Sequence, residues 1–158
     1  MGMVLFYHHM RGTVEETVAT LLTRAMSQGW RVMLRGTDAG RLERLDARLW
    51  TDPPDGFLPH GQAGGAHDAD QPVLIGTGAA VNGARALLLV DGALASVEEA
   101  AAMERVWLLF EGADAAAVEA ARGEWRRLTG AGVAAQYWSD AGGRWAMQTE
   151  KRPAEVSA

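Results

Sequence analysis

Short apolar runs of strand length alternate along the chain with longer segments in which apolar residues recur every three or four positions. The short runs predict strands at 3–8, which should be buried, and at 31–35, 72–76, 86–92 and 106–112, with final strand candidates at 133–139 and 144–150. The longer segments predict helices at about 13–29, 37–50, 96–105 and 114–130. Most of the strands are apolar throughout, which is typical of a mainly parallel sheet covered on both faces. The pattern therefore predicts an α/β fold with a three-layer α/β/α, Rossmann-like architecture.

Polar residues with a capping function precede three of the predicted helices. Thr13 is followed three positions later by Glu16, and Ser96 by Glu99, so both pairs match the capping-box pattern. Asp114 is expected to cap the last long helix. These residues fix where the helices should begin.

The segment RLWTDPPDGFLPHG, at 48–61, departs from the polar composition expected of a loop. Trp50 closes the second helix, and Phe57 and Leu58 follow two adjacent prolines. The segment continues into a stretch rich in Gly and Asp, which we expect to be mobile at 64–70. Apolar side chains in so turn-rich a segment either pack back on the domain or face a partner.

The composition limits the class of protein. A chain of 158 residues that is 48% hydrophobic can form one domain with a sizeable core. We assign 1–150 to that domain and expect 151–158 to be a frayed tail. The chain has no cysteine, which excludes disulfides and thiolate metal sites and fits a reducing cytoplasm. The first residues do not match a signal peptide, and no apolar run reaches the length of a membrane span.

The charge is unevenly distributed. A net charge of −5 argues against broad binding to duplex nucleic acid. Residues 118–152 hold six basic and four acidic side chains, so this segment carries +2 and the rest of the chain −7. A locally basic end favours an anionic partner at one site. The alternative is a helix face with solvated charges.

The glycine motifs of nucleotide-binding folds are absent. HHMRGT follows the first strand in place of G-x-G-x-x-G, and no phosphate-loop pattern occurs. GTGAAV at 76–81 begins like a dinucleotide fingerprint but has Val81 where a small residue belongs. The four histidines lack a metal-ligand spacing, and the serines lack the context of a nucleophile elbow. We therefore expect no active site, no cofactor and no metal.

Four segments in this α/β pattern resemble a known family. LDARLWTDPPDGFLPHG, PVLIGTG, ALLLVDGA and RGEWRRLTGAG are similar to segments of the chi subunit of bacterial DNA polymerase III holoenzyme. The resemblance runs from VLFYH to about RWAMQTEK, and the Leu-Trp pair followed by Phe-x-Pro-His is its most specific part. It implies a non-catalytic accessory protein of the clamp-loader complex. Such a protein joins the psi subunit to the acidic C-terminal tail of single-stranded-DNA-binding protein.

The resemblance implies a psi-binding surface in the apolar loop. Its residues are Trp50, Phe57, Leu58, Pro59 and His60. Prolines restrict the loop, so presenting a Phe to a partner costs less ordering entropy, and aromatic side chains commonly anchor interfaces. The alternative is that Trp50 and Phe57 fold back on the core of the domain.

The resemblance also implies a tail-binding site on the last long helix. Arg122 and Trp125 match the family's positions, but Val118 stands where the family has a further basic residue. Arg126 is the nearest substitute, one helical turn from Arg122. Guanidinium groups suit carboxylates, and an aromatic wall suits the Phe that ends the tail. The alternative is that Trp125 belongs to the core, on one stripe with Leu128.

Two other functions remain open at this point. One is a chi-like adaptor that serves a DNA-repair helicase instead of, or beside, the clamp loader. The other is a nucleotide- or metal-dependent enzyme that uses the carboxyl edge of the sheet. The resemblance further implies a cytoplasmic, nucleoid- and replisome-associated protein without a membrane contact or direct sequence-specific contact with nucleic acid.

Overall fold

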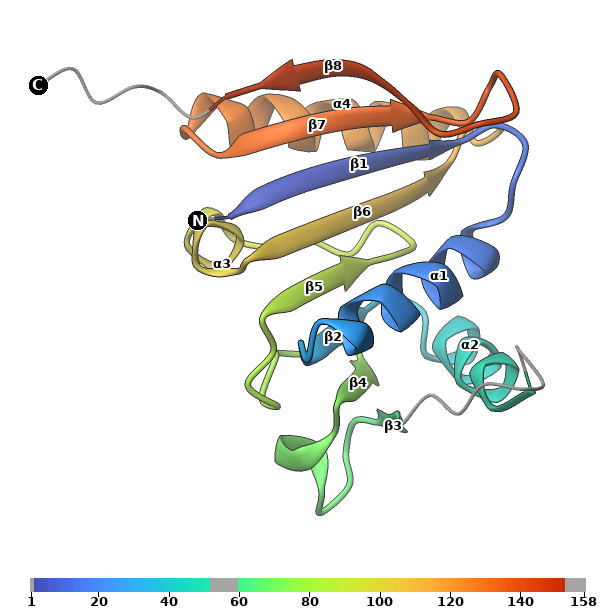
Figure 1. Cartoon of the computed structure of the whole chain (residues 1–158), viewed down its shortest axis with the longest axis vertical. Helices are drawn as coiled ribbons and strands as arrows, with labels where there is room; N and C mark the ends of the chain where they lie inside the picture. Colours follow the sequence, from blue (N-terminus) through green and yellow to red (C-terminus); the bar gives the residue numbers. More distant parts are fainter. Residues whose placement is uncertain (1, 52–59, 153–158) are drawn as a thin grey trace, which may run out of the picture.

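One mixed sheet forms the centre of the molecule (Figure 1). The computed structural model describes residues 2–51 and 60–152, with only the backbone of Trp50 and Thr51. Within these residues, eight strands follow the order β3-β4-β2-β5-β6-β1-β7-β8. They are β1 (Met3–His9), β2 (Val32–Arg35), β3 (Gly61–Gln62), β4 (Val73–Gly76), β5 (Ala86–Leu89), β6 (Arg105–Glu111), β7 (Ala134–Ser139) and β8 (Ala146–Lys151). Every neighbouring pair is parallel except β7 and β8, which form an antiparallel hairpin.

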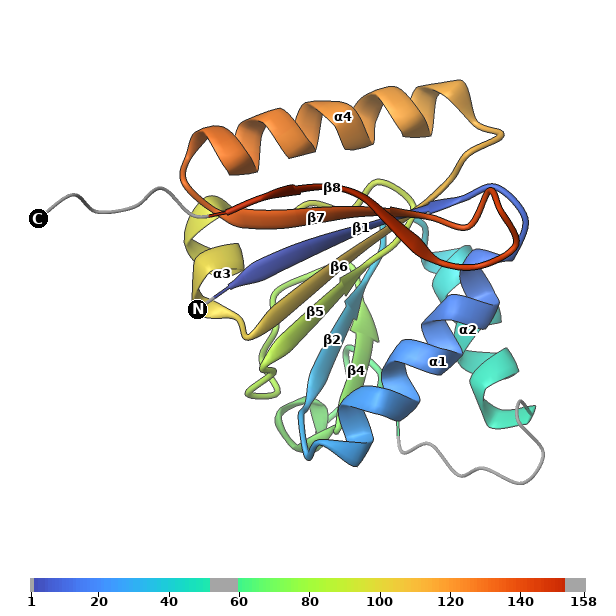
Figure 2. The same cartoon turned by 45° about the horizontal axis from the view of Figure 1, so that its top comes forward.

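The helices cover the two faces of the sheet. They are α1 (Val14–Ser27), α2 (Ala39–Thr51), α3 (Val97–Ala102) and α4 (Ala115–Gly130). Figure 2 shows α4 on one side of the sheet and α1 with α2 on the other. Buried residues of α1 and α2 belong to one hydrophobic cluster, and those of α3 and α4 to a second. The predicted three-layer α/β/α fold with a mainly parallel sheet is confirmed.

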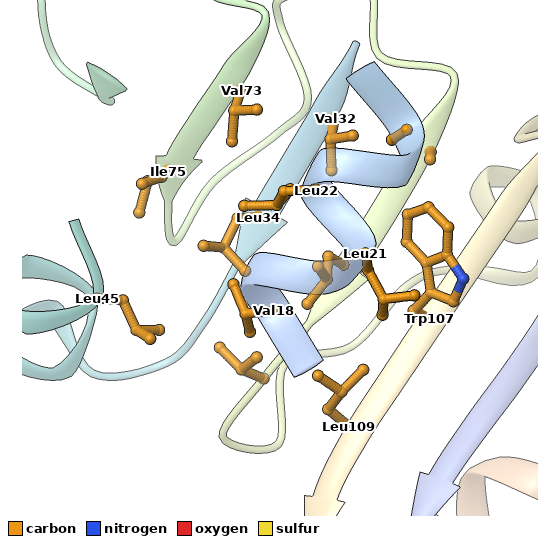
Figure 3. Close-up of a cluster of buried hydrophobic side chains, with 14 of the residues drawn as sticks. Val18, Leu21, Leu22, Val32, Leu34, Leu45, Val73, Ile75, Trp107 and Leu109 are labelled. Atoms are coloured by element: carbon orange, nitrogen blue, oxygen red, sulfur yellow. The ribbon is translucent and has the colours of Figure 1, made fainter. Parts of the chain in front are cut away.

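Each face of the sheet has its own core because successive side chains of a strand point to opposite faces. On the α1 face, Val18 and Leu22 of α1 pack over Leu34 of β2 (Figure 3). Trp107 of β6 lies at the border of this cluster, beside Leu21. On the α4 face, the fully buried side chains include Phe6, Leu74, Leu87 and Leu128.

The predicted capping residues accept hydrogen bonds at the helix N-termini, but neither predicted capping box has its return bond from the Glu side chain. Thr13 and Ser96 accept hydrogen bonds from the N–H groups of Glu16 and Glu99, and Asp114 accepts two from the first turn of α4. Ser96 and Glu99 do not form a complete capping box, because the Glu99 carboxylate is bonded to Arg35 instead. The Glu99 carboxylate therefore binds the buried Arg35 guanidinium and not the backbone at the start of α3.

One predicted strand ends earlier than expected, and one predicted loop contains a short helix. The strand predicted at 86–92 ends at Leu89, because Asp91 and Gly92 adopt positive φ angles of 53° and 79° and turn the chain. The stretch expected to be mobile at 64–70 contains the short 3₁₀ helix η1 (Asp68–Asp70). The Asp68 carboxylate accepts hydrogen bonds from the N–H groups of Gly64 and Gly65, which hold this turn together.

The single-domain assignment of 1–150 remains a prediction. Strand β8 extends one residue beyond it, to Lys151. Most of the tail predicted to fray lies outside the described residues.

Candidate functional site

An aromatic assembly surrounds the half-buried Trp125 on α4. Phe6 of β1 meets the Trp125 ring edge to face, with 5.4 Å between ring centroids. Tyr137 of β7 lies 6.1 Å from Trp125 at 75° and stacks on Phe6 at 6.2 Å. Trp125 therefore contacts the core with one part of its ring and leaves another part accessible, so the two sequence-based interpretations of this residue are compatible.

Arg122 lies exposed beside this assembly, on the same flank of α4. Its charge acts on both His8 and Tyr137, which places the guanidinium near the carboxyl ends of β1 and β7. Among the described residues, no hydrogen bond or ion pair engages Arg122. It can therefore accept an incoming carboxylate without first breaking an internal ion pair.

The other two predicted positions on α4 behave differently. Arg126 is exposed, and its Nη2 lies 3.6 Å from Oε1 of Glu119 in a surface ion pair of the kind that contributes little to stability. Val118, at the position where the resemblance leads us to expect a basic residue, is half-buried against the α4-face core. The structure thus brings Arg122 and Trp125 together with Tyr137, while Arg126 lies farther round the helix.

His8 is a member of this site that the sequence did not single out. Its Nδ1 lies 2.9 Å from the Tyr137 hydroxyl, and its ring lies 4.9 Å from that of Phe110. Burial and the positive charge of Arg122 lower the pKa of His8, so the imidazole favours its neutral form. Its Nε2 is buried without a hydrogen-bond partner and points at Gly112, where a side chain would collide with it. The sequence signal was the position of His8 at the end of the first strand.

The predicted psi-binding surface is only partly described. Phe57, Leu58 and Pro59 lie outside the described residues, and only the backbone of Trp50 is described. The His60 side chain is buried, with Nε2 at 3.2 Å from both the carbonyl oxygen and Oδ1 of Asp46 on α2. His60 thus points inward to α2, and its assignment to the psi-binding surface remains a prediction. It fixes the end of the loop to α2.

The carboxyl edge of the sheet is occupied by the protein's own side chains. Asp140 accepts hydrogen bonds from the N–H groups of Met10, Arg11 and Gly12, in the turn between β1 and α1. Dinucleotide-binding folds place a phosphate at the corresponding turn. Burial alone would raise the pKa of Asp140, but these three N–H donors lower it overall. A carboxylate that favours its ionised form thus sits where the enzyme hypothesis requires a ligand.

A second edge position is filled by Arg35, at the end of β2. Its guanidinium donates to the carbonyls of Gly78 and Leu94 and to both carboxylate oxygens of Glu99, at 2.8 and 2.7 Å. The loop after β4, where GTGAAV begins like a dinucleotide fingerprint, is therefore bound to Arg35, and no helix follows it. Sequence reasoning missed this network because its members are far apart along the chain.

No metal-ligand cluster and no membrane-spanning helix occur in residues 2–51 and 60–152. Within these ranges, no three His, Cys, Asp or Glu side chains come together in a way that could hold a metal ion. No helix in the described part of the chain is long and apolar enough to cross a bilayer.

Comparison with known proteins identifies the family. A family model described as "DNA polymerase III chi subunit, HolC" matches residues 1–136. A curated relative from Pseudomonas aeruginosa, named "DNA polymerase III subunit chi", is 34% identical over 74 residues, or 47% of this chain. The chain spans about half the length of that relative, at 51%. Because the family model covers most of the chain, the chain belongs to the family of DNA polymerase III chi subunits.

Proposed function

We propose that this chain is a non-catalytic replisome adaptor. It links the clamp-loader complex, through the psi subunit, to the acidic C-terminal tail of single-stranded-DNA-binding protein. Membership of the chi family supports an accessory role in DNA replication. The observation that carries the adaptor function is the unpaired Arg122 beside the accessible part of Trp125.

The chemistry of this α4 site fits an acidic, apolar-ended peptide. The Arg122 guanidinium offers a planar fork of donors to a carboxylate, which is a charge-assisted interaction. The rings of Trp125 and Tyr137, backed by the buried ring of Phe6, form a rigid wall beside it. A terminal Phe would lie against that wall while its carboxylate meets Arg122.

The loop that begins at Trp50 supplies the second surface. Here the proposal rests on the resemblance for Trp50, Phe57, Leu58 and Pro59. The buried His60, bonded to Asp46, anchors the far end of the loop to α2. Helix α2 lies on the face of the sheet opposite α4 (Figure 2), so the two partners would approach from different sides.

The direct test is a titration of the protein with a labelled peptide that is acidic and ends in Pro-Phe with a free carboxylate. Fluorescence anisotropy should show affinity on the order of micromolar, because a short disordered peptide loses entropy on binding. The affinity should fall as salt rises, since exposed charges are screened over roughly 10 Å at 0.1 M ionic strength. Absence of binding, or binding that salt leaves unchanged, would contradict a charged α4 site.

Capture from cell extract would identify the larger partners. The adaptor function predicts that clamp-loader subunits are retained by the wild-type chain and lost with Phe57→Ala. Retention of a repair helicase would instead support the alternative adaptor. We place either assembly in the cytoplasm, at the nucleoid.

A further inference from the structure

A groove on the α1 face of the sheet has no part in the proposed adaptor sites. It consists of a hollow of about 440 Å³ and a second of about 180 Å³, which share Tyr7, Leu21 and Arg24 as lining residues. We call these two hollows the α1 groove. Figure 1 shows α1 beside β5 and β6, so that it leaves β1 and β7 uncovered on this side, whereas α4 lies behind β7.

Aromatic side chains line both ends of the α1 groove. Trp138 and Trp145 line the larger hollow, and Trp30 and Trp107 line the smaller. The Trp145 ring lies 4.9 Å from that of Tyr7 at 80°, and Trp138 donates its Nε1–H to Gln136. These contacts fix the rings before any partner binds, so little conformational entropy is lost on binding.

Two arginines without partners flank Tyr7 in the middle of the groove. Among the described residues, the guanidinium groups of Arg24 and Arg105 take part in no hydrogen bond or ion pair. The Nε of Arg105 is also buried. A buried donor without an acceptor is costly, and a carboxylate that accepts from it removes that cost. Both arginines line the smaller hollow together with Tyr7.

We propose that the α1 groove binds an extended segment of a partner protein that carries carboxylates and large apolar side chains. The carboxylates bind Arg24 and Arg105, and the apolar side chains lie against Trp138 and Trp145. Single-stranded nucleic acid stacks on aromatics too, but it needs a track of cations along its phosphates. Here Glu16 lines the larger hollow, and its negative charge opposes a polyphosphate.

This site is distinct from the α4 site. The sheet separates it from Arg122 and Trp125, because Tyr7 and Tyr137 point to opposite faces. Trp138 and Trp145 also lie beyond residues 1–136, the part of the chain that the family model matches. The groove is therefore completed by the β7–β8 hairpin.

The test uses protein labelled with 5-fluorotryptophan, in which single Trp→Phe variants assign each ¹⁹F signal. The probe is a short peptide of alternating Asp and Phe, amidated so that it lacks the terminal carboxylate expected to engage Arg122. We expect the signals of Trp138 and Trp145 to move on titration while that of Trp125 stays. Arg24→Gln with Arg105→Gln should weaken binding at least tenfold, whereas the matched surface change Arg85→Gln should not.

Three results would overturn the proposal. They are movement of the Trp125 signal alone, equal binding of a Lys-Phe peptide, and stronger binding of oligothymidylate than of the acidic peptide. Dimerisation in sedimentation velocity that abolishes peptide binding would assign the groove to a second copy instead. If the double variant does not fold, peptide binding is measured with the single variant Arg24→Gln instead, because Arg24 is exposed. If the tail peptide does not bind at Trp125 while the ¹⁹F signals of Trp138 and Trp145 still respond to the acidic peptide, the result contradicts the adaptor function and leaves the groove proposal standing.

Discussion

The carboxylate of Asp140 holds the backbone of Gly12, whose N–H donates to Oδ2 at 2.7 Å. The same side chain accepts from Met10 and Arg11 at 2.6 and 3.1 Å. The turn that could bind an external anion in this type of fold is therefore closed by an internal one. This arrangement favours a binding protein over a nucleotide-dependent enzyme.

Replacing this carboxylate should destabilise the fold. Asp140→Ala leaves three N–H donors without their acceptor, and we expect a loss of roughly 2–3 kcal/mol in the free energy of unfolding. Asp114→Ala is the matched control, because it removes an exposed cap that accepts two hydrogen bonds and should cost about 1 kcal/mol. Urea denaturation measures both. A smaller loss for Asp140→Ala than for Asp114→Ala would contradict the role assigned to this turn.

The Arg35–Glu99 pair should contribute far more than a surface pair. Glu99→Ala leaves the buried Arg35 guanidinium without its carboxylate, and we expect a loss of about 3 kcal/mol. Glu104→Ala removes the partner of Arg85 at an exposed site, 3.8 Å apart, and should cost less than about 1 kcal/mol. Thermal melts of the two variants compare them directly. Equal melting temperatures would show that the Arg35 network is not structural.

Acidification should weaken the fold in two steps. Burial lowers the pKa of His9 and outweighs its hydrogen bonds to backbone carbonyls and the nearby charge of Asp140. The folded state therefore prefers neutral His9. Its contribution is complete above the unfolded value of 6.5 and is lost as the pH falls through the lower folded pKa. The hydrogen bonds from Arg35 lower the pKa of Glu99, so a second loss begins below 4.5.

Urea denaturation between pH 8 and pH 5 measures the first step. The free energy of unfolding should decline below pH 6.5 in wild type, and the decline should be smaller in His9→Gln. His67→Gln is the control, because this exposed side chain should leave the wild-type slope intact. A wild-type profile that is flat from pH 8 to pH 5 would refute the prediction.

Features that join residues close together in the sequence could be predicted, whereas features that join distant residues could not. The caps at Thr13 and Asp114 were predicted because a cap and its helix are adjacent. The three-layer fold followed from the apolar strands. Strand β3 was missed because two residues carry no periodic signal. The Asp140 turn and the Arg35 network join residues 128 and 64 positions apart, so only the folded sheet brings them together.

The candidate site, too, could be predicted only where its residues are close in the sequence. Arg122 and Trp125 were found through the resemblance and their spacing on one helix. Tyr137 and His8 complete the site from β7 and β1, and parallel pairing of these strands places them beside α4. Sequence alone does not give the order of strands in a sheet. It also could not show that His60 points inward to Asp46.

Tail binding should depend on one flank of α4. Arg122→Ala with Trp125→Ala should weaken binding of the acidic, Phe-ending peptide at least tenfold, because both the cation and the aromatic wall are lost. Arg127→Ala is the matched control on the other flank, where Arg127 is bonded to Glu124 and to the carbonyl of Ala95. Anisotropy titration measures each variant. An equal effect of Arg127→Ala would point to general electrostatics and not to a site.

The loop surface should respond independently of the α4 site. Phe57→Ala should cost ~2 kcal/mol of binding to a psi-type partner and leave the melting temperature nearly unchanged, as expected of an interface anchor. A core Phe would instead cost ~3–5 kcal/mol of stability. Tail-peptide affinity should stay at the wild-type value, because changes at distant sites are nearly additive. If Phe57→Ala reduced both affinities in a folded protein, the two partners would have to share one surface.

The order of the strands also governs how copies of the chain meet at high concentration. An exposed strand at the border of a sheet is a template for pairing with another chain. Here one border is β3, which has two residues, and the other is β8, which carries Glu150 and Lys151. The pairing of β8 with β7 also shifts register at Tyr137 and Trp138, which bends that border. Both borders of the described sheet thus disfavour sheet-to-sheet aggregation, so concentrated protein should stay dispersed.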